Sequence, residues 1–174
     1  MAIRGGEYAV ARMIAVLQAS LPAELDLIDA EESDGIVLDD VPNPAYFDYE
    51  TQIQNVEHPL AIVVNLVSTS PVRMFSTTNS PGTYEAMHTI TVEVSLKNIE
   101  NKDPDTLKKR ILRYARAIER VIVIKNPTLP LAGVEQVVNV GREDDVTYIF
   151  QEQEEGADVR TASIPFRVHT RENL

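Results

Sequence analysis

The chain has 174 residues, 44% of them apolar, contains no cysteine and has a formal net charge of −11. This length suits one soluble domain with a buried core, over residues 1–174. The lack of cysteine excludes disulfides and thiolate metal sites, and no apolar run is long enough to span a membrane. The acidic charge argues against a protein that wraps or reads nucleic acid, because an acidic surface repels duplex phosphate.

The net charge comes from a single segment. Between Met13 and Val72 the sequence contains no Lys or Arg. The acids of that segment are Glu24, Asp26, Asp29, Glu31, Glu32, Asp34, Asp39, Asp40, Asp48, Glu50 and Glu57. Its part at 25–49 is predicted to be irregular, with one short strand at 36–38, because prolines interrupt it. Ordinary solvated loops explain such a composition; the alternative is an acidic surface that faces a basic partner or passing DNA.

An N-terminal helix is predicted from Glu7 to Ala19. Apolar residues recur in it at the spacing of one helix face, and Pro22 follows shortly after the last of them. These residues are Tyr8, Val10, Met13, Ile14 and Leu17. We expect the helix to end before the proline.

Two strands separated by a long loop are predicted next. Residues 60–67 are almost continuously apolar and rich in β-branched residues, as in a central strand covered on both faces. Residues 89–97 alternate between apolar and polar, as in a half-buried antiparallel strand. The segment 68–83 between them is rich in Ser, Thr, Pro, Gly and Asn, which predicts a polar hairpin loop. At its centre stand Arg73, Met74 and Phe75. Met74 and Phe75 either fold back on the chain's own core or belong to an arm that docks on another subunit.

A second helix is predicted from Asp103 to about Val121. Asp103 can cap its first turn, and Pro104 suits the first helical position. An apolar stripe runs along one side, and a narrow band on the opposite side is basic. The basic residues are Lys109, Arg113, Arg116 and Arg120. Such a band is usually a solvated face, but its charges repel each other, and the acidic segment of a neighbouring copy would relieve that repulsion.

Three further strands are predicted at 134–140, 146–151 and about 159–170. Short, turn-rich segments connect them, so we expect an antiparallel meander. Together the elements predict an α+β domain with a mainly antiparallel sheet, two helices packed on one of its faces and one long hairpin loop.

The sequence contains no recognisable catalytic or metal-binding motif. Its histidines, at positions 58, 88 and 169, are far apart and are expected to be solvated or on edge strands. A calcium-loop match at 29–40 fails because the turn glycine comes one residue late and Asp40 replaces the usual bidentate glutamate. Glycine-rich phosphate loops and nucleophile turns are missing from the sequence as well. We therefore expect no enzyme, no cofactor and no metal.

The order of elements resembles the small tail terminator and neck proteins of long-tailed bacteriophages. The resemblance begins with the N-terminal helix, the irregular stretch 42–50 that ends in Tyr-Phe-Asp-Tyr-Glu, a buried strand, a long polar hairpin and an alternating strand. It continues with the helix at 105–120, the Asn-Pro-Thr-Leu at 126–129 and a closing meander. No short signature defines this family, so the likeness is one of architecture over most of the chain.

The resemblance implies a structural virion protein of the tail or neck, made in the host cytoplasm. In the family, copies form a hexameric ring that caps the tail tube and joins it to the head connector. The implied partners are further copies, the tail tube protein and the neck connector, while DNA passes through the lumen without sequence-specific binding. No catalytic residues are carried over. The residues that we expect at a protein interface are Arg73, Met74, Phe75, Lys109, Arg113, Arg116 and Arg120.

Other functions stay open at this point. Tail-tube subunits, head-completion proteins and other head–tail connectors resemble the family in the order and composition of their elements. From another class, carboxylates could serve a small hydrolase or a ligand-binding domain, and a monomeric adaptor is a third option. A ring protein would form hexamers in solution, whereas an enzyme would have a concave pocket with convergent polar groups and shifted carboxyl pKa values.

Overall fold

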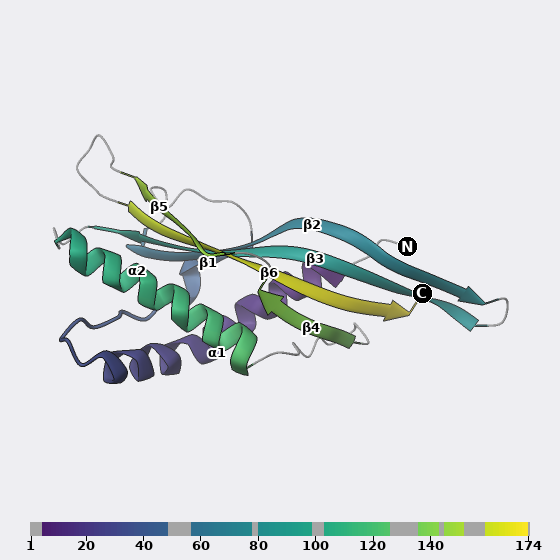
Figure 1. The fold of residues 1–174 in the computed structure, drawn as a ribbon, viewed down its shortest axis with the longest axis horizontal. Coiled ribbons are helices and arrows are strands. Elements are labelled where there is room, and N and C mark those ends of the chain that lie inside the picture. The colour runs from purple at the N-terminus through teal and green to yellow at the C-terminus, as the bar shows by residue number, and fades with distance from the viewer. Residues whose placement is uncertain are drawn as a thin grey trace.

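A computed structural model describes residues 5–48, 57–77, 80–98, 103–125, 136–142, 145–151 and 159–173. The backbone alone is described at 72–77, 80–84, 136–142, 150–151 and 172–173. The described strands form one six-stranded, mainly antiparallel sheet, and the helices α1 and α2 pack on one of its faces (Figure 1). This arrangement confirms the predicted α+β class.

Helix α1 spans Gly5–Glu32 and contains Pro22 in its interior. The prediction that the helix ends before this proline was wrong. A proline inside a helix removes one backbone hydrogen bond and costs roughly 3 kcal/mol. Burial outweighs this cost, because the apolar face continues past the proline with Leu21, Leu25 and Ile28, all almost fully buried.

The chain turns sharply after α1. Gly35 has a φ of +80°, a left-handed conformation that glycine adopts without strain. The strand predicted at 36–38 does not form, because the amide of Leu38 donates to Asp29 Oδ2 instead of to a neighbouring strand. A short 3₁₀ turn, η1 (Asn43–Ala45), then leads into the two-residue strand β1 (Tyr46–Phe47), which runs parallel to β2.

Strands β2 (Leu60–Thr77) and β3 (Ser80–Lys97) form a long antiparallel hairpin. Their pairing runs from Leu60 opposite Leu96 to Thr77 opposite Ser80, with three register shifts. The prediction of a loop at 68–83 was therefore wrong. A strand needs backbone pairing rather than an apolar surface, and the Thr and Val residues of this segment suit a strand. Residues 68–71, the part of the segment whose burial is described, are all exposed to solvent, in keeping with their polar composition.

Strand β6 (Val159–Asn173) pairs with β3 along almost its whole length. On its other edge it pairs with β4 (Gln136–Arg142) and, further along, with β5 (Thr147–Gln151). The predicted meander was wrong, because β4 and β5 lie in line along β6, each antiparallel to it, and occupy the same edge.

The interruption between β4 and β5 coincides with a proline. Arg142 lies opposite Phe166 and Thr147 opposite Ser163, so the interruption falls opposite Ile164 and Pro165. Proline has no backbone N–H and is found in sheets mainly at edges and bulges. We attribute the two-part edge of β6 to this residue.

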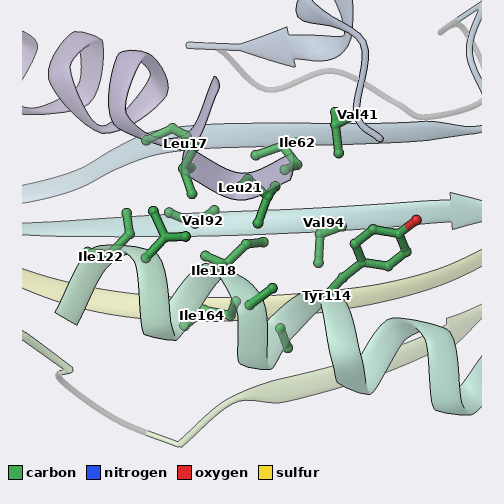
Figure 2. Close-up of a cluster of buried hydrophobic side chains, with 14 of the residues drawn as sticks. Leu17, Leu21, Val41, Ile62, Val92, Val94, Tyr114, Ile118, Ile122 and Ile164 are labelled. Atoms are coloured by element: carbon green, nitrogen blue, oxygen red, sulfur yellow. The ribbon is translucent and has the colours of Figure 1, made fainter. Parts of the chain in front are cut away.

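Helix α2 spans Pro104–Glu119, and its predicted cap is confirmed. The Asp103 carboxylate accepts a hydrogen bond of 2.9 Å from the Thr106 amide. A π-helical stretch, η3 (Arg120–Lys125), extends α2. The apolar stripe packs against the sheet and α1, as Figure 2 shows. The side chains labelled there come from α1 (Leu17, Leu21), the segment before η1 (Val41), the sheet (Ile62, Val92, Val94, Ile164), α2 (Tyr114, Ile118) and η3 (Ile122).

Candidate functional site

The basic band of α2 faces the acidic segment of the same chain. Arg113 is 6% exposed, and its guanidinium donates to both oxygens of Asp34 at 3.0 and 2.6 Å. Arg116 donates to Glu32 at 2.7 Å, and Lys109 Nζ lies 3.5 Å from Asp34 Oδ2. Acidic side chains of the same chain thus offset the repulsion among these basic residues, a role that we had expected of a neighbouring copy.

Two further cations, Arg120 and Lys125, extend this row of ion pairs, which we call the ion-pair ladder, at the end of α2. Arg120 donates to Glu31 at 2.9 and 3.0 Å and contacts Glu24 at 3.3 Å. Lys125 also forms an ion pair with Glu24, whose side chain is almost completely buried. The hydrogen bonds that Arg120 donates to Glu31 and Glu24 raise the pKa of its guanidinium. These contacts tie α2 and η3 to α1, so the reason for assigning Lys109, Arg113, Arg116 and Arg120 to an interface between copies no longer holds.

The other predicted interface residues lie far out on the hairpin. The backbones of Arg73, Met74 and Phe75 belong to β2 and pair with β3, opposite Glu85, Tyr84 and Thr83. Their side chains lie outside the described part of the structure. The arm is consequently a β-ribbon with defined register, and the structure does not test its role in docking.

The outer edge of β2 is paired with another strand only near its start. β1 pairs with β2 only at Ile62 and Val63. Further along, residues 67–71 are all exposed, Val67 to 59%. In the described part of the chain no strand pairs with this edge beyond Val63. An unpaired strand edge offers backbone donors and acceptors to a strand of another chain.

His88 is fully buried in the sheet, which corrects the expectation of a solvated or edge-strand histidine. One ring nitrogen lies 2.9 Å from the Thr69 hydroxyl oxygen, and the other lies 2.8 Å from that of Thr170. The ring therefore links β2, β3 and β6. The first turn of α1 lies against it, since a Cβ on Gly6 would come within 3.1 Å of Nδ1. Burial, with a smaller contribution from His169, lowers the pKa of His88.

A charged cluster occupies the opposite face of the same strands. Arg171 forms an ion pair with Glu85, and His169 Nε2 lies 3.5 Å from Glu85 Oε2. The Glu85 side chain is only 9% exposed, so the ion pair neutralises a nearly buried carboxylate. These contacts hold β6 to β3 outside the helix-covered core.

A cavity of about 330 Å³ lies at the other end of the sheet. It is open to solvent on one side and is lined by residues of the segment 39–42, the start of β2, the end of β3 and the first turns of α2. Its polar lining comes from Asp39, Asp40, Lys97, Asn98 and Arg110. Arg110 is 4% exposed and forms an ion pair with Asp39.

The sequence reasoning missed this cavity and the burial of His88. One signal was available: Arg110 follows Leu107 by three residues and borders the apolar stripe, where a charge points to a buried ion pair. No comparable signal exists for His88, because its Thr69 and Thr170 partners are distant in sequence and meet only through strand register.

Comparison with known proteins does not narrow the assignment. No protein-family model matches the chain, and no curated protein matches it at a significant level. Across the residues described above, no three His, Asp or Glu side chains gather as metal ligands. Within the same ranges, neither helix combines the length and the apolar character needed to cross a membrane.

Proposed function

We propose that this chain is a structural subunit of a bacteriophage tail, namely a tail terminator. Copies of it form a hexameric ring in the neck of the virion. The ring caps the tail tube and joins it to the head connector, and DNA passes through its lumen without sequence-specific contacts. This proposal builds on the resemblance in element order and on the α+β fold.

The observation that carries the proposal is the long exposed edge of β2. A sheet with two different edges can join copies head to tail. Such an interface forms a ring when the rotation from one copy to the next closes after a whole number of copies. The β2 edge beyond Val63 is exposed over residues 67–71, and the opposite edge is formed by β4 and β5. Pro71 stands within the exposed edge, as prolines do in strands that avoid indiscriminate pairing.

The charge distribution agrees with a channel for DNA. The sheet face away from the helices carries hydroxyl side chains, including Ser95 and Thr161, whose oxygens lie 2.8 Å apart. Arg113, Arg116 and Arg120 are paired with acids at the end of α1 and just after it. With a net charge of −11, the subunit offers DNA little attraction.

A tube subunit or another head–tail connector has the same fold requirements. The two kinds of assembly differ in how they stop, because a terminator forms single rings and a tube subunit stacks them. Electron microscopy of the purified protein, alone and with tail tubes, separates single rings from stacks.

The test of the edge uses two exposed valines. Val67 lies on the β2 edge at 59% exposure, and Val37 lies in the turn after α1 at 67% exposure. We expect Val67→Lys to lower the fraction of rings seen by light scattering and microscopy, since a lysine on an edge opposes pairing. Val37→Lys should assemble normally. A wild-type monomer at high concentration, without rings on tubes, would contradict the proposed function.

A further inference from the structure

We propose that the cavity between residues 39–42, the start of β2, the end of β3 and α2 binds a carboxylate carried on a short aliphatic group. This site goes beyond the structural role proposed above and does not depend on it. The cavity has a volume of about 330 Å³, near the lower limit of roughly 300 Å³ for ligand pockets, which favours a small ligand.

The walls of the cavity select an aliphatic group. Three leucines from three elements line it: Leu60 of β2, Leu96 of β3 and Leu107 of α2. All three are at most 3% exposed. Pro42 and Pro59 complete the wall, and Pro59 is fixed by a 2.7 Å hydrogen bond from the Lys97 amide to its carbonyl oxygen. A branched aliphatic group of a few carbons that binds here moves from water into contact with apolar side chains, which is favourable.

Arg110 supplies the recognition of a carboxylate. Its side chain is 5% exposed and uses Nη2 for the ion pair with Asp39. Its buried Nε has no hydrogen-bond partner among the described residues. A guanidinium has five donors in a planar fork and can hold a second carboxylate beside the first. Lys97 adds a second cation to the lining, and burial lowers its pKa, which an anion nearby would offset.

The arrangement of charge excludes large polyanions. The Asp39 side chain is 69% exposed, and Asp40 is exposed as well, so the acids lie toward solvent and the arginine lies inside. A nucleic acid would meet the acids first and could not enter a cavity of this size. A small monocarboxylate can pass them and reach Arg110.

The first experiment titrates the full-length protein with 4-methylpentanoate and follows leucine methyl signals by NMR. We expect shifts at Leu60, Leu96 and Leu107 and a Kd in the millimolar range, as suits a ligand of about eight heavy atoms. The neutral 4-methylpentanamide should bind at least about tenfold more weakly, because it lacks the charge that Arg110 recognises. Acetate should be weaker still. Equal binding of acid and amide, or no shift at these methyls, would overturn the proposal.

A matched pair of variants locates the site. Leu107→Phe fills the cavity and should abolish the shifts, whereas Leu112→Phe, on the exposed side of the same helix, should keep them. If Leu107→Phe fails to fold, the pattern of shifted leucine methyl signals in the wild-type protein decides whether the ligand binds in this cavity. A peptide ending in leucine, with a free or an amidated terminus, tells a free ligand from the end of a protein chain. Selective binding of the free peptide or of free 4-methylpentanoate supports the site, and binding of neither refutes it.

Discussion

The helix-covered half of the sheet and the part that extends past it are stabilised by different interactions. In the first half, aliphatic side chains of α1, α2 and three strands pack at 0% exposure, among them Leu17, Ile118 and Ile164 (Figure 2). In the extension, residues 68–71 of β2 are exposed, and backbone pairing between β2, β3 and β6 holds the strands together. His88, which lies under the first turn of α1, marks the border between the two parts. The helix-covered half therefore contains the apolar core, whereas the described part of the extension depends chiefly on backbone pairing.

The largest loss of stability should come from the core half. Ile118→Ala removes a fully buried side chain between α2 and the sheet and should lower the free energy of unfolding by about 2–5 kcal/mol. Leu27→Ala, at a position 50% exposed on α1, should cost less than about 0.5 kcal/mol. Urea denaturation measures both. Similar losses in the two variants would mean that the core does not dominate stability.

The second-largest loss of stability should come from the ion-pair ladder between α2 and the acids at the end of α1 and just after it. Arg113→Ala removes a nearly buried guanidinium with two hydrogen bonds to Asp34 and should cost about 1.5–3 kcal/mol. Arg116→Ala, at 39% side-chain exposure, should cost less than about 1 kcal/mol. The same denaturation experiment compares them. If these variants stay folded as monomers but no longer assemble, the basic band acts at an interface between copies, as the sequence first suggested.

The same pair predicts a loss of stability in acid. The hydrogen bonds from Arg113 and, less strongly, from the Ile36 amide lower the pKa of Asp34 from 3.8 to about 2. The folded state thus binds this proton less readily than the unfolded chain, so the contribution is complete above about pH 4 and is lost as the pH falls toward 2. We expect the stability difference between wild type and Arg113→Ala to shrink across this window. A constant difference would contradict this account.

Replacing His88 tests the polar contacts that join β2, β3 and β6 under the first turn of α1, and a smaller effect is expected. His88→Gln should cost about 1 kcal/mol at pH 8, where one hydrogen bond to a threonine is lost. The lowered pKa of His88 means that the unfolded chain takes up a proton first as the pH falls below about 6.5, so wild type loses stability there. The deficit of His88→Gln should therefore narrow with falling pH. His58→Gln is the control, and a parallel pH profile for wild type and His88→Gln would refute the idea.

The smallest effect on the subunit itself should come from the far end of the ribbon. Replacing Met74 and Phe75 with Ser should change thermal stability little but reduce ring formation or tube binding, if these residues dock on another subunit. One preparation of the double variant provides both measurements. Unfolding by several kcal/mol, with assembly lost as a consequence, would place these residues in the subunit's own core.

Local patterns predicted the elements that carry the core. The alternation at 89–97 and the Asp103 cap are in the structure as the sequence implied. Polar composition misled at 68–83, since strand pairing there depends on the partner strand and not on burial. Pro22 misled at α1, because the benefit of burying Leu25 and Ile28 lies in tertiary contacts that a local rule does not include.

The candidate sites were harder to predict than the fold. The band of α2 was found from helical spacing, but its partners, such as Asp34, are 79 residues away in sequence. The cavity beside Arg110 needs four separate segments to meet. Such meetings depend on the complete topology, which element order alone does not supply.

The position of β6 also governs when the subunit can be finished during synthesis. β6 is the last strand in the sequence, yet it lies between β3 and the line of β4 and β5. Until residues 159–173 have left the ribosome, β3 has an open edge along most of its length, and β4 and β5 lack the strand with which they pair. Nascent chains on one messenger RNA are therefore exposed to mispairing with each other until translation has passed this strand.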